Sequence, residues 1–400
     1  MEGDMAELNE LTAQEIGRRL RIARENAAIR QEDAAQFIGV SRPTLVSIEQ
    51  GVRRVRIQEI QLLGRHYGVS VNSLLRREAV HVDLVPRFRK LRETEDTQTA
   101  EAVRLFNDLI KADVEMENIL GIQRRRNYPP ERGLNESDVA TLAEKHAKEL
   151  RDWLGLGPGP IADIFSIIEL DLGIRLYQRR LPSNSKVAGL FSYDESIGAC
   201  ILLNASHPLR RRIQSAAHEI GHFYGTRQTP EVLEEDEKFL SRDERYANAF
   251  GRAFLTPAES FSESFRQLKQ ITGKTTRRLI ILLAQQYNIS RQACCLRLEE
   301  LGLAKKGTWA WFENNGGITD EHAREVLGEM TDRRDPARSD ADRPISHRLS
   351  LMAHAVWKRE LMSEGQLAEL LKLGRVEVRG IIDQIELEER ETDELLKLPD

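Results

Sequence analysis

Hydrophobic residues recur every three or four positions along much of the chain, a pattern typical of amphipathic helices. Near the N-terminus this pattern predicts helices over residues 15–29, 31–38, 57–67 and 71–75. Another helix is predicted from Ser41 to Ile48, because Ser41 is a favourable N-cap residue and Pro43 lies in the first turn, where proline is tolerated. A turn containing Gly39 separates it from the preceding helix. Short helices joined by such a turn predict a helix-turn-helix unit.

The pattern changes in the middle of the chain, where short segments alternate between apolar and polar residues. Alternation is typical of strands that are buried on one face. Strands are predicted over residues 174–177, 189–193 and 199–203, and helices over 138–154, 161–170 and 243–257. The preceding segment, 80–123, is predicted to be mostly helical, with a sparse apolar stripe of Leu105, Leu109, Val114 and Leu120. The fold class is therefore mainly α with a small mixed α+β domain.

The C-terminal third is predicted to be helical again. Residues 282–303 and 363–385 both have the shape of a helix-turn-helix. Their arginines are not concentrated, so we interpret them as scaffold or partner surface rather than as further DNA readers. Residues 332–343 are polar and predicted to form a disordered hinge.

Composition and charge narrow the interpretation. The 400 residues are 40% hydrophobic and 31% charged, and the three cysteines exclude a disulfide framework. No 18-residue apolar run occurs, and the acidic start Met1-Glu2-Gly3-Asp4 does not resemble a signal peptide, so we expect a cytoplasmic protein that does not enter membranes. The formal net charge is −5, yet residues 15–77 contain twelve Arg against six Asp and Glu. This basic segment indicates nucleic-acid binding at the N-terminal end alone.

The strongest chemical signal is His218-Glu219-Ile220-Gly221-His222. On a helix, residues four apart lie on the same face, so His218 and His222 are placed to bind one tetrahedral metal ion. Glu219 lies about 100° around the helix and is better placed to act on an activated water than to be a ligand. The alternative is a pair of hydrogen-bonded histidines on an ordinary core helix.

A third ligand is predicted downstream. Ala247, Phe250, Gly251 and Phe254 form an apolar helical face, and Glu244 shares that face near the helix start. Small residues there allow another helix to approach closely. Two histidines, one glutamate and one open position are the ligand set of a zinc hydrolase. Alternatively, Glu244 is a helix N-terminal charge favoured by the dipole.

The segments AAHEIGH and DERYANAFGRAFLTP resemble the ImmA/IrrE metallopeptidases, and GACILLNAS resembles the strand before their metal helix. The resemblance implies a zincin-like fold, His218, His222 and Glu244 as metal ligands and Glu219 as general base. It implies Zn²⁺, with Mn²⁺ as the alternative. Gly251 and Thr256 depart from the Ala and Met expected there, and we interpret both as remote from the chemistry.

The segment QEDAAQFIGVSRPTLVSIEQG resembles the Xre/Cro family of repressors. The resemblance implies that the second helix of the motif enters the major groove. In that position Arg42, Thr44 and Ser47 face base edges, and Ser41 begins the helix. Gln31 and either Arg53 or Arg54 are then expected to contact phosphates. The alternative is a helical protein-interaction module.

These motifs divide the chain into predicted parts: a DNA-binding domain, a helical connector, a peptidase domain, a helix-turn-helix-like subdomain and a C-terminal helical subdomain, at 11–78, 79–135, 136–265, 266–330 and 345–400. Cys200 lies on a strand predicted to be near the metal, where a thiolate could occupy the open ligand position and hold the enzyme inactive. The pattern favours a small buried strand residue instead.

Together, the two ends predict a transcriptional regulator with a metal-dependent endopeptidase domain. The ImmA/IrrE resemblance implies cleavage of a repressor or antitoxin-like protein, or of the chain itself, in a stress or mobile-element response. Expected partners are double-stranded operator DNA, a protein substrate and a second copy of the chain in a homodimer. The alternative is a transcription factor whose zincin-like domain senses a ligand or metal without turnover.

Overall fold

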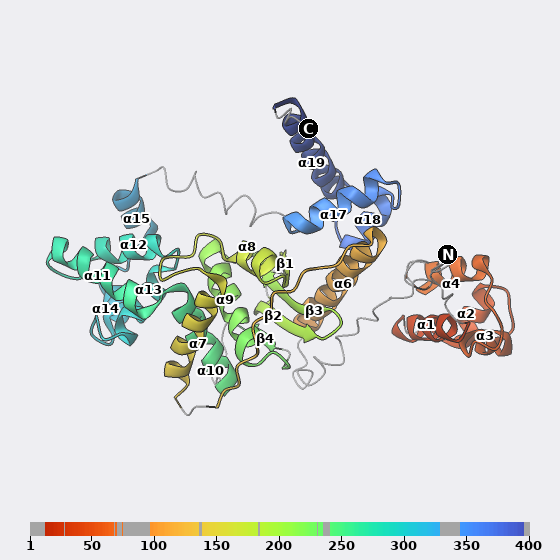
Figure 1. Ribbon diagram of the computed structural model, residues 1–400, viewed down its shortest axis with the longest axis horizontal. Coiled ribbons are helices and arrows are strands. Elements are labelled where there is room, and N and C mark those ends of the chain that lie inside the picture. Colours follow the sequence, from red (N-terminus) through yellow and green to blue (C-terminus); the bar gives the residue numbers. More distant parts are fainter. Residues whose placement is uncertain are drawn as a thin grey trace, which may run out of the picture. The chain divides into compact units, whose positions relative to one another are not determined.

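A computed structural model describes residues 13–27, 29–67, 69, 74, 97–135, 138–182, 185–229, 231–234, 241–328 and 345–395 (Figure 1). Its contacts divide the chain into two compact units. One contains residues 1–81 with 114–123, and the other contains 82–113 with 124–400. Each unit is described separately below.

The N-terminal unit is a small helical domain. Its helices are α1 (Ala13–Asn26), α2 (Gln31–Phe37), α3 (Arg42–Glu49) and α4 (Ile57–Tyr67). Leu20, Leu45 and Leu63 are completely buried between them. The predicted helices at 31–38, 41–48 and 57–67 are confirmed, whereas the one at 71–75 lies outside the described residues except for Leu74.

Gly39 and Ser41 shape the turn between α2 and α3. Gly39 has a φ of +71°, a left-handed conformation that glycine adopts without strain. Ser41 then caps α3, as predicted, by accepting a hydrogen bond from the Thr44 amide. Behind the turn, the buried Arg24 guanidinium donates to Glu49 at 2.6 Å, which fixes α1 against α3.

A four-stranded mixed sheet forms the centre of the second unit. It contains β1 (Arg175–Arg179), β2 (Val187–Asp194), β3 (Gly198–Asn204) and β4 (Glu231–Glu234) in the order β1-β3-β2-β4. β1 pairs parallel to β3, and the other two pairings are antiparallel. β4 is not among the strands predicted from the alternation of apolar and polar residues.

Helices cover the sheet. α7 (Val139–Leu154), α9 (Leu209–Gly225) and α10 (Arg242–Leu255) pack together, and α9 also contacts β2 and β3. Ala199, Ile201 and Leu203 of β3 belong to the same hydrophobic core as α9. On the opposite face, Tyr177 of β1 donates a hydrogen bond to Asp113 of α6 (Thr97–Leu120).

Two predicted helices differ in detail. The helix predicted over 161–170 begins only at Ile164 as α8 (Ile164–Ser166), because Asp163 caps it, and continues as a π-helix, η2 (Ile167–Asp171). The stripe predicted on α6 was too narrow, since Phe106, Ile110 and Met116 are also completely buried. The buried face of α6 also includes a charged residue, Asp113, so it does not appear in the sequence as a continuous apolar stripe. Asp113 pairs with Arg124 and Arg175 at 3.1 and 3.2 Å.

The remaining described helices are α11 (Ala258–Thr272), α12 (Arg277–Gln286), α13 (Arg291–Glu300), α14 (Thr308–Asn314), α15 (Asp320–Leu327), α17 (His347–Lys358), α18 (Glu364–Leu371) and α19 (Arg375–Leu395). One hydrophobic core continues from α7 through α13 to Ile318, so the boundary predicted at residue 265 falls inside α11. The predicted hinge at 332–343 lies outside the described residues.

Candidate metal centre and DNA-binding surface

Three glycines bring α9 and α10 into close contact. A Cβ at Gly221 would lie 2.9 Å from the Ala247 Cα, and one at Gly225 would lie 2.3 Å from the Tyr246 ring. From the other helix, a Cβ at Gly251 would lie 3.0 Å from the backbone nitrogen of His218. From the sequence, Gly251 is predicted to be remote from the chemistry. The structure shows instead that Gly251 packs against the backbone of His218, a candidate ligand. This close approach brings Glu244 of α10 to the histidines of α9.

His218, His222 and Glu244 converge on one point. The Nε2 atoms of the two histidines are 3.0 Å apart, and they lie 3.3 and 3.2 Å from the Oε2 and Oε1 atoms of Glu244. All three side chains are buried. In a tetrahedral zinc site with bonds of about 2.0–2.1 Å, ligand atoms are separated by about 3.3 Å. The three side chains thus fit the spacing that a zinc ion requires.

The second nitrogen of each histidine has its own polar partner. His218 Nδ1 lies 3.1 Å from Asn248 Oδ1, and His222 Nδ1 lies 3.0 Å from Thr226 Oγ1. With the proton on Nδ1, the lone pair on Nε2 points to the centre, which is the tautomer that binds a metal. Asn248 and Thr226 were not assigned from sequence, although each lies four residues after a ligand on the same helix face or its extension.

The electrostatics of the cluster favour the protonation states that metal ligands need. Burial lowers the pKa of His222, so its imidazole is neutral. Burial acts to raise the pKa of Glu244, but the two adjacent imidazoles outweigh it and hold that pKa at about 2. Neither Glu244 oxygen has a well-formed hydrogen bond within the described part of the chain. A buried carboxylate in this condition requires a cation.

Glu219 lies beside the cluster and faces the sheet. It is completely buried, and a Cβ at Gly189 of β2 would lie 2.3 Å from its Oε1. Gly189 therefore leaves the space that the carboxylate occupies. The pairing of β2 with β4 shifts register between Val187 and Gly189, a bulge of the kind found near active sites. Sequence reasoning missed Gly189, because nothing local indicates which strand faces the metal helix.

The structure does not place Cys200 at this centre. Its neighbours in β3, Ala199 and Ile201, belong to the core shared with α9, so by alternation the thiol points to the other face of the sheet. Its electrostatic neighbours are Arg175 and Asp113, which lie on that face. Burial raises the pKa of Cys200 to about 12, so it is a protonated, buried strand residue. This position fits the small buried strand residue that the sequence pattern favoured over a regulatory thiol.

On the N-terminal unit, the predicted base-reading residues lie on α3. Arg42 is exposed, and Thr44 and Ser47 are half-buried. Ser41 and Thr44 share a hydrogen bond of 2.8 Å between their hydroxyls, and Ser47 donates to the Pro43 carbonyl at 3.0 Å.

The three residues predicted to contact phosphates, Gln31, Arg53 and Arg54, differ in whether their side chains are already hydrogen-bonded within the domain. Arg53 donates two hydrogen bonds to Glu59, at 3.0 and 2.8 Å, whereas Arg54 is exposed. Arg54 is thus better placed than Arg53 to contact a phosphate. Gln31 donates to Glu49 at 2.9 Å, which directs its amide to the interior. The Arg53–Glu59 pair was missed because its members lie in different segments, on either side of the start of α4.

Family models match two parts of the chain. Residues 15–76 match a helix-turn-helix domain, and residues 170–299 match a peptidase family described as the IrrE N-terminal-like domain. The chain therefore joins a DNA-binding helix-turn-helix domain to a metallopeptidase-like domain. It is a regulator with a peptidase-like domain, and His218, His222 and Glu244 form a candidate metal site in it. Among the described residues, no helix is long and apolar enough to cross a membrane.

No curated protein matches the chain. Three solved structures show a distant likeness. ComR from Streptococcus suis is 14% identical, with 96% of this chain and 97% of that chain covered and a TM-score of 0.16. Apo ComR from Streptococcus vestibularis is 13% identical, with 83% and 98% covered and a TM-score of 0.16. Bacillus thuringiensis PlcR in complex with the peptide PapR7 and DNA is 9% identical, with 96% and 100% covered and a TM-score of 0.17. Likeness at this level does not establish a shared function.

Proposed function

We propose that the chain is a transcriptional regulator whose metallopeptidase-like domain is an active zinc-dependent endopeptidase. The observation that carries the proposal is the convergence of His218 Nε2, His222 Nε2 and Glu244 within 3.0–3.3 Å, with each Nδ1 held by a polar partner. If His218 and His222 were only hydrogen-bonded core residues, there would be no reason to bury the Glu244 carboxylate beside them without a hydrogen-bond donor. Glu219 next to this cluster supplies the acid–base group that hydrolysis requires.

The residues of the chain divide the chemistry between them. When bound to His218, His222 and Glu244, a zinc ion supplies a Lewis acid for the peptide carbonyl and the attacking water. Glu219 accepts the proton of that water at its carboxylate and delivers it to the leaving amine nitrogen. Asn248 and Thr226 keep the two imidazoles in the required tautomer and orientation. Water exclusion follows from the burial of all four side chains.

The regulatory part of the proposal concerns operator DNA and a protein target. Arg42, Thr44 and Ser47 of α3 contact base edges, and Arg54 contacts a phosphate. The chain binds as a homodimer, since two copies would read the two halves of a symmetric operator. The substrate is a repressor or antitoxin-like protein, or the chain itself, so that proteolysis changes transcription in a stress or mobile-element response. The fusion of both domains in one chain supports this coupling.

Metal analysis of site variants tests the peptidase part. The wild-type chain should purify with about one equivalent of zinc, as three protein ligands and one water hold one ion. His218→Ala, His222→Ala and Glu244→Ala should each lose most of the metal. Glu219→Gln should keep it, because Glu219 is not a ligand, and should lose about 10²–10⁴ in the rate of peptide cleavage.

Circular dichroism controls for folding in each variant. Full zinc occupancy in Glu244→Ala would remove Glu244 from the ligand set, and the neighbouring Asp243 would be the next candidate. Undiminished cleavage by Glu219→Gln would remove Glu219 as the base.

A further inference from the structure

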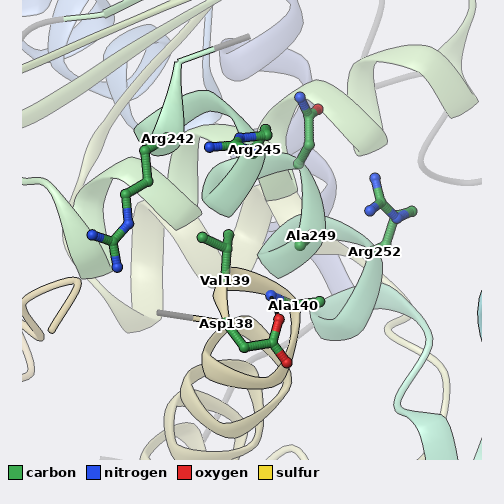
Figure 2. A pocket seen from close by; sticks show the side chains of 8 residues that line it. Asp138, Val139, Ala140, Arg242, Arg245, Ala249 and Arg252 are labelled. Carbon is green, nitrogen blue, oxygen red and sulfur yellow. Dashed lines mark hydrogen bonds between the residues drawn. The ribbon is translucent and has the colours of Figure 1, made fainter. Parts of the chain in front are cut away.

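A pocket of about 690 Å³ lies between the start of α7 and α10 (Figure 2). Asn248 of α10 is one of the residues that line it. A volume of several hundred Å³ is the range of small-molecule sites. None of His218, His222, Glu244 and Glu219 lines it. The pocket is therefore distinct from the metal centre and has no part in the proposed hydrolysis.

The lining is positively charged. Arg242, Arg245 and Arg252, all from α10, line the pocket (Figure 2). Within the described part of the chain, Asp138 is the one acidic residue of the lining, and it already accepts hydrogen bonds from the Ala140 amide and the Thr141 hydroxyl. Arg252 also contacts Glu300 at 3.3 Å, whereas Arg245 is exposed. Guanidinium groups bind carboxylates and phosphates by paired hydrogen bonds, so this lining favours an oxyanion.

Apart from Asn248, the rest of the lining is apolar and comes from both helices. These residues are Val139 and Ala140 of α7 and Ala249 of α10 (Figure 2). An inorganic anion alone would leave the half-buried Val139 and the exposed Ala140 uncovered. A ligand that combines an oxyanion with an apolar body matches the lining better.

Asn248 connects the pocket to the metal centre. It lines the pocket, and its Oδ1 lies 3.1 Å from His218 Nδ1. An amide that accepts through its oxygen retains two N–H donors of its own. A ligand oxyanion that accepts from this amide nitrogen would fix the Asn248 side chain and thereby the His218 ring. Glu219 faces β2, on the sheet side of α9, so occupancy of the pocket leaves the general base untouched.

We propose that this pocket binds a small molecule with an oxyanion group and an apolar body, and that its occupancy raises the zinc affinity of the metal centre through Asn248 and His218. The proposal rests on the metal site of the proposed function for its second part, but not for its first. By linkage, a ligand that favours the metal-competent orientation of His218 is itself bound more tightly when the metal is present.

The first experiment measures binding to the chelator-treated full chain by titration calorimetry, so that peptidase activity plays no part. The probes are phenyl phosphate and 3-phenylpropionate, which present an oxyanion as phosphate and as carboxylate on the same kind of body. The neutral control is 3-phenylpropanol. At least one anionic probe should bind at least tenfold more tightly than the alcohol. Equal binding of all three, or no binding, would overturn the proposal.

Matched variants locate the binding. Arg245→Gln should weaken the anionic probe about tenfold or more, the loss typical of a charge-assisted hydrogen bond. Arg278→Gln removes the same charge from an exposed position on α12 that does not line the pocket, and should have no effect. Equal losses in both variants would show that the probe senses net charge and not this pocket.

The second experiment measures zinc affinity by competition with a chelator, with and without a saturating probe. In the wild type, the probe should tighten zinc binding about fivefold or more, within the usual range of coupling between sites. Asn248→Ala should still bind the probe, yet its zinc affinity should no longer respond. An unchanged zinc affinity in the wild type, or an unchanged response in Asn248→Ala, would refute the link through Asn248. Loss of zinc binding altogether in the wild type would refute the proposed metal centre instead.

Discussion

The chain builds the same backbone turn twice, between α2 and α3 and between α12 and α13, with different chemistry around each. In the first, Val40 N donates to Ala35 O at 2.9 Å, Gly39 has a φ of +71° and Ser41 caps the next helix. In the second, Ile289 N donates to Ala284 O at 3.0 Å, Asn288 has a φ of +53° and Ser290 caps the next helix. The two turns correspond residue by residue at an offset of 249 positions, since 289 − 40 and 284 − 35 both equal 249.

The surfaces of the two turns differ. Arg42, the first residue of α3, is exposed, whereas its counterpart Arg291 donates to the Thr319 carbonyl and to Asp320. At the buried position, Ile48 of α3 corresponds to Arg297 of α13. Arg297 donates to the Thr256 carbonyl at 2.9 Å and pairs with Glu144 at 2.5 Å, which ties α13 to the peptidase core. We infer that the exposed side chains, and not the backbone geometry of the turn, decide whether such a unit binds DNA.

The largest effect is expected at the buried arginine. Arg297→Ala should lower the free energy of unfolding of the second unit by about 3–5 kcal/mol, because it leaves a cavity and removes the donor to the buried Thr256 carbonyl. Urea unfolding followed by circular dichroism measures it. Arg291→Ala is the matched control and should cost less than about 1 kcal/mol, as its pair with Asp320 is exposed. Equal losses would contradict a scaffold role centred on Arg297.

The next effect separates the two turns by function. Arg42→Ala should weaken binding of the full chain to its operator by about 1–3 kcal/mol, the discrimination typical of one base contact. Arg291→Ala should leave operator binding unchanged. Fluorescence anisotropy with operator and scrambled duplexes measures both. A loss in Arg291→Ala that equals the loss in Arg42→Ala would make the second turn a DNA reader as well.

The smallest effect concerns Arg53, whose guanidinium is paired with Glu59 within the N-terminal unit. Glu59→Gln should release Arg53, because the bidentate pair at 2.8 and 3.0 Å depends on a carboxylate. One additional phosphate contact steepens the slope of log affinity against log salt concentration by about 1. Salt titrations of the wild type, Glu59→Gln and Glu59→Gln with Arg53→Gln measure it. The double variant should return to the wild-type slope; a slope that stays steep would exclude Arg53 as the cause.

Local spacing was sufficient to predict much of this molecule. The four-residue spacing of His218 and His222 and the apolar face that Glu244 shares with Ala247 predicted a cluster that the fold brings together. Long-range pairings could not be predicted in this way. The strand alternation separated Cys200 from Ala199 and Ile201, but only the packing of α9 shows which set faces the histidines. The place that Gly189 leaves for Glu219 likewise depends on which strand lies against α9.

The central claim is that a DNA-binding regulator also cuts proteins, and the most direct measurement is a search for newly formed protein N-termini in cells. Cells that carry the wild-type chain and cells that carry Glu219→Gln are compared by mass spectrometry of labelled N-termini, with expression and zinc content of the two chains matched. The account predicts at least one new N-terminus, in a repressor-like protein or in the chain itself, that is present with the wild type and absent with Glu219→Gln. Under a condition that induces the regulated promoter, identical sets of N-termini together with equal promoter output in both strains would contradict it and leave a metal-binding transcription factor without turnover.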